Sequence, residues 1–302
     1  MAMIKTVLCP VDFTPVCERE IALAIDLCRT FGSRLVLHHN LEAPSPGMAM
    51  AWMWNQENAA GQRPQADAEA TLRELLKKLP ADVQAEACVS DGQVASTLLY
   101  LERQLPADLL VMATHGRSTE DHSSLAERLI ERSTCPVLVL HDCESEASPI
   151  PKPEKRVEVL VPTDWSEGGM QAVEYAFELA RTLHWRIHLL HVVSVGDVTR
   201  TEVSAPSMMS AKSPGEMLAE NRARLDDLVP QDLRERVLCY VELGEPSEKI
   251  VEVSRRLEVE CIVMGMHARS LLRRFFTHDT SRELLHRAGC PVWFIPGEKA
   301  AA

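Results

Sequence analysis

The sequence repeats itself once along its length, and this repeat limits what the chain can fold into. VLCPVDFT from Val7 aligns with VLVPTDWS from Val159, a shift of 152 residues. The same shift aligns VMATHGRS from Val111 with VMGMHARS from Val263, and CPVLVL later in the first copy aligns with CPVWFI in the second. Each copy has about 150 residues, which is the size of a domain and not of a solenoid repeat. The sequence therefore predicts two similar domains in one chain.

The two copies are separated by a segment with the composition of a linker. ESEASPIPKPEK, residues 144–155, holds three prolines among charged and small residues. Such a segment neither continues a helix nor packs into a core. We expect a first domain at 1–143, a linker at 144–155 and a second domain at 156–302.

Strand and helix patterns alternate within each copy. Short apolar runs with many β-branched residues indicate buried strands, and the segments between them carry apolar residues at helical spacing. Alternating strands and helices form parallel sheets with right-handed crossovers. The predicted fold class is α/β, with five parallel strands doubly wound in each half. The expected strands are 6–11, 34–39, 83–89, 108–113 and 136–140, then 157–163, 187–193, 236–242, 260–265 and 291–295.

Charge and composition exclude several classes of protein. The formal net charge is −12, so a broad basic face for nucleic acid is not expected. No apolar run reaches the ~18 residues of a membrane span, and the first residues lack the pattern of a signal peptide. A cytoplasmic location is the expectation. The nine cysteines are scattered without a C-x-x-C pair, which disfavours a disulfide framework and a zinc ribbon.

The sequence offers no pattern for catalysis or for a metal ion. His188 and His191 stand three apart on an expected strand and point to opposite faces, so they do not chelate together. No G-x-S-x-G turn, complete Walker loop or G-x-G-x-x-G turn is present. We therefore expect neither a bound metal nor an enzyme.

Polar residues follow the first and fourth strands of each copy, where open parallel sheets bind ligands. An Asp after strand 1 accepts hydrogen bonds from a ligand, and a loop that enters a helix aims backbone N–H groups at phosphate. The alternative is that Asp12 and Asp164 cap the following helix, and that His115 and His267 bond to backbone. The candidate nucleotide-binding residues are Asp12, Thr14, Gly116, Arg117, Ser118, Ser123 and Ser124, then Asp164, Ser166, Gly265, Arg269 and Ser270.

The strand-1 Asp loop, the HGRS-type turn after strand 4 and the closing CPVLVL strand together resemble the universal stress protein family. The resemblance covers nearly the whole chain, twice, as in a tandem-domain member. It implies two flavodoxin-like sheets, of the adenine nucleotide alpha hydrolase-like type, with strand order 3-2-1-4-5. It also implies that the fifth strands of the two halves pair within one chain. Some members of the family bind ATP and others do not.

The phosphate loop of the ATP-binding members, G-x2-G-x9-G-[ST], is broken in both halves. In the first half Ala113 takes the leading Gly position, Gly116 is kept, and Ser123-Ser124 take the final pair after a three-residue deletion. In the second half Gly265 is kept, but Ala268 and His278-Asp279 replace the others. Added Cβ atoms restrict close approach of the backbone, and Asp279 repels phosphate. Four arginines nearby either offset that repulsion or form a solvated face of a helix. They are Arg269, Arg273, Arg274 and Arg282.

These patterns favour a non-enzymatic binding or regulatory protein of the stress response with degenerate nucleotide sites. The alternative is an ATP-binding universal stress protein with slow ATPase activity. ATP is therefore the one cofactor that the resemblance implies. A homodimer is a further expectation. Met48 to Trp54 form an apolar arm, which either packs on the protein itself or docks a protein partner or an apolar ligand.

Overall fold

The computed structural model describes residues 4–14, 16–42, 64–114, 120–141, 148, 150, 156–194, 213–266 and 278–297. The chain divides into two compact units, Met1–Leu138 and Val139–Ala302. The Met48–Trp54 arm, the linker apart from Ser148 and Ile150, and both loops after the fourth strands lie outside the described residues.

The first repeat forms a parallel sheet in the order β3-β2-β1-β4-β5. Strand β1 pairs with β2 from Thr6 opposite Arg34 to Pro10 opposite His38. Its elements are β1 (Thr6–Pro10), α1 (Val16–Phe31), β2 (Arg34–Glu42), α3 (Pro64–Lys78), β3 (Ala85–Gly92), α4 (Val94–Gln104), β4 (Leu109–Thr114), α5 (Glu120–Arg132) and β5 (Val137–His141).

The second repeat forms a sheet with the same order of strands, β8-β7-β6-β9-β10. All its strand pairs are parallel. Its elements are β6 (Glu158–Pro162), α6 (Glu167–Leu183), β7 (Arg186–Val193), α8 (Pro214–Leu228), the 3-10 turn Gln231–Leu233, β8 (Val237–Leu243), α9 (Pro246–Arg256), β9 (Cys261–Gly265), α10 (His278–Arg287) and β10 (Val292–Ile295).

The predicted fold class is confirmed, with strand order 3-2-1-4-5 in the first repeat and the same order in the second. The apolar spacing predicts helices over 70–79 and 125–132, but these two helices begin earlier, at Pro64 and Glu120. Their first turns are polar, so apolar periodicity does not report them. Strand β2 extends to Glu42 because its ladder with β3 continues to the pair of Glu42 and Gly92.

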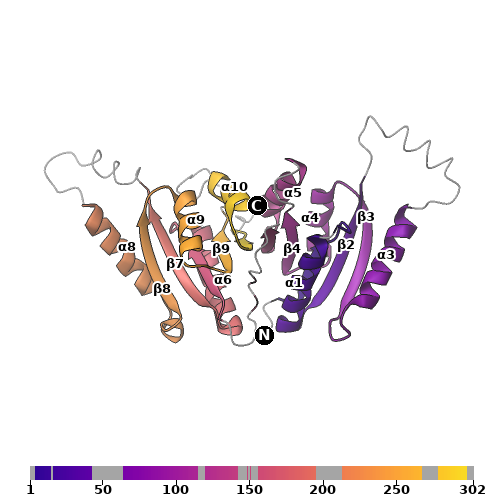
Figure 1. Ribbon diagram of the computed structural model, residues 1–302, viewed down its shortest axis with the longest axis horizontal. Helices are drawn as coiled ribbons and strands as arrows, with labels where there is room; N and C mark the ends of the chain where they lie inside the picture. The colour runs from indigo at the N-terminus through magenta and orange to yellow at the C-terminus, as the bar shows by residue number, and fades with distance from the viewer. Residues whose placement is uncertain are drawn as a thin grey trace. The chain divides into compact units, whose positions relative to one another are not determined.

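Helices cover both faces of each sheet (Figure 1). Right-handed crossovers place α1 and α3 on one face of the first sheet, and the reversal of strand order places α4 and α5 on the other. Helix α4 packs against α5, and α9 packs against α10 in the second repeat. Both sheets are therefore buried on both sides. The carboxyl ends of β1 and β4 meet at one edge of the first sheet, and those of β6 and β9 meet at one edge of the second.

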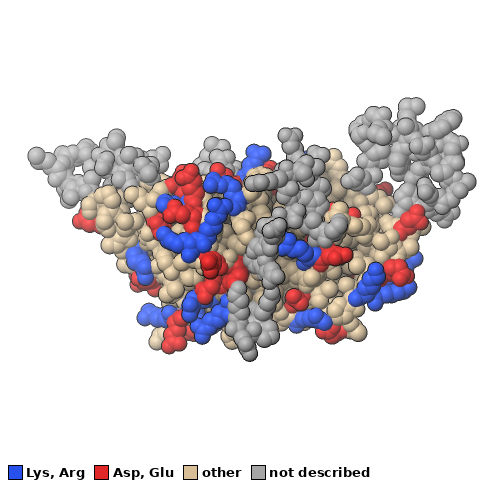
Figure 2. All heavy atoms as spheres, in the orientation of Figure 1, with Lys and Arg blue, Asp and Glu red and all other residues tan. Residues whose placement is uncertain are grey.

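The described surface carries charges of both signs. On the face drawn in Figure 2, acidic and basic side chains are interspersed over both repeats. Within the described ranges no helix has the length and apolar character needed to cross a bilayer.

Candidate functional site

The loop after the first strand has the same geometry in both repeats. In the first repeat, the backbone N–H and the hydroxyl of Thr14 both donate to Asp12 Oδ1, at 2.9 and 2.6 Å. In the second, the backbone N–H of Ser166 donates to Asp164 Oδ1 at 3.0 Å, and its hydroxyl donates to the same oxygen. The structure therefore brings together the predicted pairs of Asp and hydroxyl residues at the carboxyl ends of β1 and β6.

The residue that caps helix α6 is Ser166 and not Asp164. The Ser166 hydroxyl accepts the backbone N–H of Gly169 at 3.1 Å and sits at the N-cap position. Asp164 accepts a hydrogen bond from the Ser166 hydroxyl and so positions the residue that caps the helix. A capping role for Asp164 is thus indirect, and an N-cap of this kind stabilises a helix by about 1 kcal/mol.

An aromatic ring follows each Asp in a left-handed backbone conformation. Phe13 has φ of 61° and Trp165 has φ of 64°, values that non-glycine residues adopt rarely and at a cost. Phe13 packs on the His39 ring with centroids 4.4 Å apart, and Trp165 packs on His191 at 5.1 Å. The loop after the first strand therefore turns an aromatic ring onto the histidine of the neighbouring strand in both repeats.

The histidine beneath each ring is held by the backbone of the same loop. His39 Nδ1 lies 2.8 Å from the carbonyl oxygen of Val11, and His191 Nδ1 lies 2.8 Å from that of Thr163. In the second repeat the site is covered further by α8, where Arg224 lies 3.9 Å above the Trp165 ring. Because each ring nitrogen that faces the loop is engaged with a carbonyl, these histidines position the loop.

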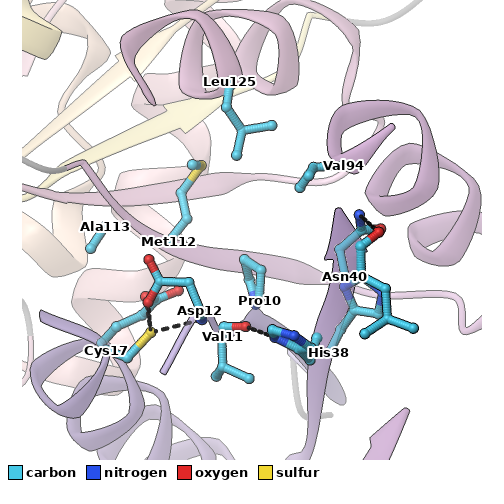
Figure 3. A pocket seen from close by; sticks show the side chains of 13 residues that line it. Pro10, Val11, Asp12, Cys17, His38, Asn40, Val94, Met112, Ala113 and Leu125 are labelled. Carbon is cyan, nitrogen blue, oxygen red and sulfur yellow. Dashed lines mark hydrogen bonds between the residues drawn. The ribbon is translucent and has the colours of Figure 1, made fainter. Parts of the chain in front are cut away.

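A pocket of about 330 Å³ opens at the carboxyl ends of β1, β2 and β4 in the first repeat. Figure 3 shows Asp12 and Cys17 on one side and Asn40 on the other, with Met112 and Leu125 above. Its described lining residues are Pro10, Val11, Asp12, Cys17, Glu20, His38, His39, Asn40, Leu41, Val94, Met112, Ala113 and Leu125.

The carboxyl groups of Asp12 and Glu20 and the Cys17 thiol form one side of this pocket, and the Cys9 thiol lies behind Glu20. The Cys17 thiol donates to Asp12 Oδ1 at 2.8 Å, and the thiols of Cys17 and Cys9 face the two Glu20 oxygens at 3.9 and 3.6 Å. Burial raises the pKa of the Glu20 carboxyl well above its ordinary value, and Asp12 adds to this rise. Burial also raises the pKa of Cys17 to about 12. Both thiols therefore stay protonated and act as donors, not as nucleophiles.

The matching place in the second repeat is occupied by backbone. A Cβ on Gly265 would lie 2.0 Å from the carbonyl oxygen of Gly168 and 2.8 Å from the nitrogen of Gly169. The first turn of α6 therefore rests directly on β9. In the first repeat Cys17 and Ala113 stand where the second has Gly169 and Gly265, and a helix and strand that carry side chains there need a wider separation. The missing side chain at Gly265 thus accommodates helix α6.

Replacing Gly265 by alanine is expected to destabilise the chain by about 1–3 kcal/mol, because backbone must move to admit the new methyl group. Urea unfolding followed by far-UV circular dichroism measures the loss. The matched control is Ala113→Gly, which creates no clash and costs roughly 0.5–1 kcal/mol through backbone entropy. An unchanged midpoint for Gly265→Ala would contradict the close contact.

Several predicted site residues lie outside the described part of the chain. Ser123 and Ser124 fall within helix α5, but their side chains are not described. Both phosphate-loop predictions therefore stay untested beyond Ala113 and Gly265. Outside the described residues lie Gly116, Arg117, Ser118, Arg269 and Ser270, together with His115 and His267.

Sequence reasoning missed five polar pocket residues: Cys17, Glu20, His38, His39 and Asn40. One signal was available for Glu20, because the repeat places Ala172 at the same position. An acidic residue opposite a buried alanine in the other repeat indicates a polar environment specific to the first. His38 likewise aligns with a residue of another kind in the second repeat, Leu190.

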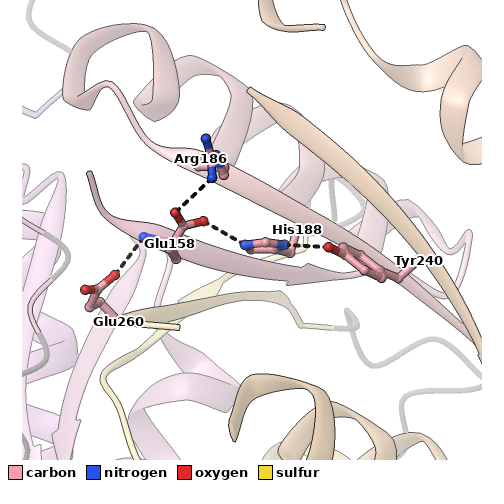
Figure 4. Close-up of polar contacts among 5 residues, drawn as sticks. All are labelled: Glu158, Arg186, His188, Tyr240 and Glu260. Carbon is pink, nitrogen blue, oxygen red and sulfur yellow. Dashed lines mark hydrogen bonds and ion pairs between the residues drawn. The ribbon is translucent and has the colours of Figure 1, made fainter. Parts of the chain in front are cut away.

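The described residues form no cluster of three or more His, Cys, Asp or Glu side chains that could hold a metal ion. His188 instead joins a structural network (Figure 4): its Nε2 lies 2.8 Å from a Glu158 oxygen and its Nδ1 lies 3.3 Å from the Tyr240 hydroxyl. His191 contacts Trp165. The two histidines have separate partners, in agreement with their predicted opposite directions.

Sequence comparison finds relatives over part of this chain. A universal stress protein of Mycobacterium tuberculosis is 28% identical over 190 residues, which cover 62% of this chain and 61% of that protein. A universal stress protein of Methanocaldococcus jannaschii is 25% identical over 144 residues, 47% of this chain and 82% of its own. The match thus spans less than two thirds of the mycobacterial relative.

Structural comparison shows the same fold in solved proteins. A universal stress protein from Archaeoglobus fulgidus superposes with a TM-score of 0.66 at 14% identity, covering 97% of both chains. A Pseudomonas aeruginosa protein superposes with a TM-score of 0.58 at 13% identity, covering 98% of this chain and 94% of its own. The model of the universal stress protein family matches residues 3–141 and again residues 157–296. This chain therefore belongs to the universal stress protein family and carries the family's domain twice.

Proposed function

We propose that this chain is a non-enzymatic binding and regulatory protein of the stress response whose nucleotide sites are degenerate. The observation that carries the proposal is the contact between Gly265 and Gly168, since α6 rests against this strand-end glycine and its missing side chain serves helix packing. In the first repeat, Ala113 stands at that position and the pocket wall carries the carboxyl groups of Asp12 and Glu20. The Asp12 carboxylate there repels a polyphosphate.

ATP is expected to bind more weakly than ~100 μM, which corresponds to less than roughly 5.5 kcal/mol of binding free energy. Calorimetric titration of the pure protein with ATP and magnesium measures this, and a phosphate-release assay measures hydrolysis. We expect no hydrolysis above the rate in buffer. Micromolar affinity or turnover would overturn the proposal.

The second candidate is an ATP-binding protein with slow ATPase activity. It is favoured by the 330 Å³ pocket at the carboxyl ends of β1 and β4, because ligands of open α/β sheets bind at that edge. If ATP binds, Asp12→Ala should weaken it, and Asp164→Ala should leave it unchanged, because the described pocket lies in the first repeat.

The proposed domain bounds are 1–143 and 156–302, joined by the linker 144–155; the family matches at 3–141 and 157–296 fall within them. A cytoplasmic location belongs to the same proposal. Pairing of the fifth strands, a homodimer, and docking of a protein or apolar ligand at Met48–Trp54 stay predictions from the sequence.

A further inference from the structure

We propose that the first-repeat pocket binds a small organic cation, an amine or amidinium group on an apolar body, held by Glu20 and Asp12. The inference rests on the proposed function, because it names the ligand class of the pocket that no longer suits ATP. It is carried by the hydrogen-bonding character of the pocket wall, by its charge and by the difference between the two repeats.

The described wall is rich in acceptors and poor in donors. Asp12 and Glu20 supply carboxyl oxygens. Two donors beside them are engaged, since the Cys17 thiol faces Asp12 and His39 Nδ1 lies against the Val11 carbonyl. The neutral ring of His38 adds one N–H donor and one acceptor. No Lys, Arg, Ser, Thr or Tyr is among the described lining residues. A ligand that matches this wall must therefore bring N–H donors of its own.

Asn40 adds an acceptor in a fixed orientation. Its amide nitrogen donates to the carbonyl oxygens of Gly92 and Leu41, at 2.9 and 3.2 Å. These two carbonyls determine which end of the amide is nitrogen. Asn40 Oδ1 is then a buried acceptor with no partner among the described residues. The two ring nitrogens of His38, one a donor and one an acceptor in the neutral imidazole, also lack partners there. Buried polar groups of this kind lower stability until a partner arrives.

The charge of the wall selects the sign of the ligand. Burial lowers the pKa of His38 to about 4, so this imidazole is neutral near pH 7. His38 therefore adds no positive charge to the wall, and the acidic groups of the wall are Asp12 and Glu20. An ammonium or amidinium ion forms charge-assisted hydrogen bonds with carboxylates, whereas a phosphate or carboxylate ligand meets repulsion.

The buried acid is specific to the first repeat and is not demanded by the fold. Glu20 is 4% exposed on helix α1, and the repeat places Ala172, which is fully buried, at the same position of α6. A helix of this fold thus packs without a carboxyl group there. Burying one costs free energy unless a partner compensates it, which is consistent with a ligand that supplies the compensation.

The apolar part of the pocket suits the body of such a ligand. Leu41, Val94, Met112 and Leu125 line the remaining wall, from β2, from the first turn of α4, from β4 and from α5. A pocket of this kind, mostly apolar with a few polar groups at one end, is the usual form of a small-molecule site.

Binding of a cation should release a proton from Glu20. The groups that face this carboxyl are Cys9 of β1, Cys17 of α1, Asp12 of the loop and the backbone N–H of Ala113 on β4. A bound cation favours the ionised form of Glu20 and lowers its pKa. Affinity should then rise with pH, and the heat of binding should depend on the ionisation enthalpy of the buffer.

Three probes of one shape test the sign of the charge: benzamidine, the neutral benzamide and the anionic benzoate, each titrated calorimetrically into the full chain. We expect benzamidine to bind at least about tenfold more tightly than benzamide, a difference of about 1.4 kcal/mol, and benzoate to bind least. Equal binding of benzoate and benzamidine, or no binding of any probe at millimolar concentration, would overturn the inference.

Substitutions locate the site. Glu20→Gln keeps the shape of the side chain and should weaken benzamidine about tenfold while leaving benzamide unchanged. The matched control is Glu18→Gln, which removes an exposed carboxylate of the same helix and should change neither. Circular dichroism checks that each variant is folded. If Glu20→Gln does not fold, Asp12→Asn replaces it as the test variant. Unchanged benzamidine binding in a folded Glu20→Gln protein would refute the assignment.

The ATP titration separates this inference from the proposed function. Tight ATP binding or hydrolysis overturns the proposed function, whatever the benzamidine series shows. Weak ATP binding together with a failed benzamidine series leaves the proposed function standing and removes the cation site alone.

Discussion

Replacing Trp293 by alanine is expected to lower the free energy of unfolding by about 3–5 kcal/mol, the usual loss for a large aromatic side chain in a core. Trp293 lies on β10 and is fully buried. Its ring packs edge-on against Tyr175 and Trp185, with both pairs of centroids 6.0 Å apart. The alanine variant leaves a cavity between these rings. Urea unfolding followed by far-UV circular dichroism measures the effect without depending on tryptophan fluorescence.

The control is Trp293→Phe, which should lose much less stability. The indole Nε1 of Trp293 is buried and has no hydrogen-bond partner among the described residues. Phenylalanine keeps an aromatic ring next to Tyr175 and removes this unpaired donor, so part of the lost packing is offset. A loss as large as that of the alanine variant would show that the indole N–H is well satisfied in the folded protein.

Acidification from pH 6.5 to 4 is expected to destabilise the chain through His38 by on the order of 3 kcal/mol. Burial, with a smaller contribution from His39, lowers the pKa of His38 from 6.5 to about 4 in the folded state. Between these values the unfolded chain binds a proton that the folded chain excludes, so stability falls as the pH falls. Below about pH 4 both states are protonated and this contribution levels off.

The variant that isolates this contribution is His38→Leu, since leucine stands at the matching position, Leu190. Glu20 contributes with the opposite sign, because its raised pKa keeps a proton in the folded state and its stabilisation is lost as the pH rises. Subtracting the curve of the variant from that of the wild type cancels Glu20 and other carboxyl groups. The difference in the free energy of unfolding should be constant above pH 6.5 and should vary with pH between 6.5 and 4. Parallel curves would show that His38 is protonated in the folded chain.

The His38→Leu variant should also be more stable than the wild type near neutral pH. Both ring nitrogens of His38 are buried without a partner among the described residues, and each such group costs about 1–3 kcal/mol. Leucine removes them while keeping an apolar side chain in β2. A less stable variant at pH 7 would point to a partner for the imidazole in solution.

The sequence by itself determined the fold, because the strands and helices of this fold follow from local patterns of apolar residues. Apolar runs such as those of β1 and β6 and the helical spacing between them depend on neighbouring residues alone. The shift of 152 residues then required both halves to share one topology. Parallel pairing and right-handed crossovers allow few arrangements of such elements, and the order 3-2-1-4-5 was available through the family resemblance. Helix starts at Pro64 and Glu120 were missed because polar first turns carry no apolar periodicity.

The strand-end position of the site was also predictable, since open parallel sheets bind ligands where β1 and β4 end. Asp12 with Thr14, and Asp164 with Ser166, lie there as expected. Their spacing of two residues places a hydroxyl and an N–H beside the carboxylate, and this local turn needs no tertiary information.

Tertiary structure alone decided what the rest of the site does. Glu20 follows Glu18 and Arg19 and reads as part of a solvated helix surface, yet the packing of α1 on β1 and β4 buries it. Gly265 reads as the first glycine of a phosphate loop, yet its lack of a side chain accommodates Gly168, which lies 97 residues earlier in the chain. Both outcomes depend on the distance between a helix and a strand that are far apart in sequence. That distance is determined by the side chains packed between them, so no local pattern reports it.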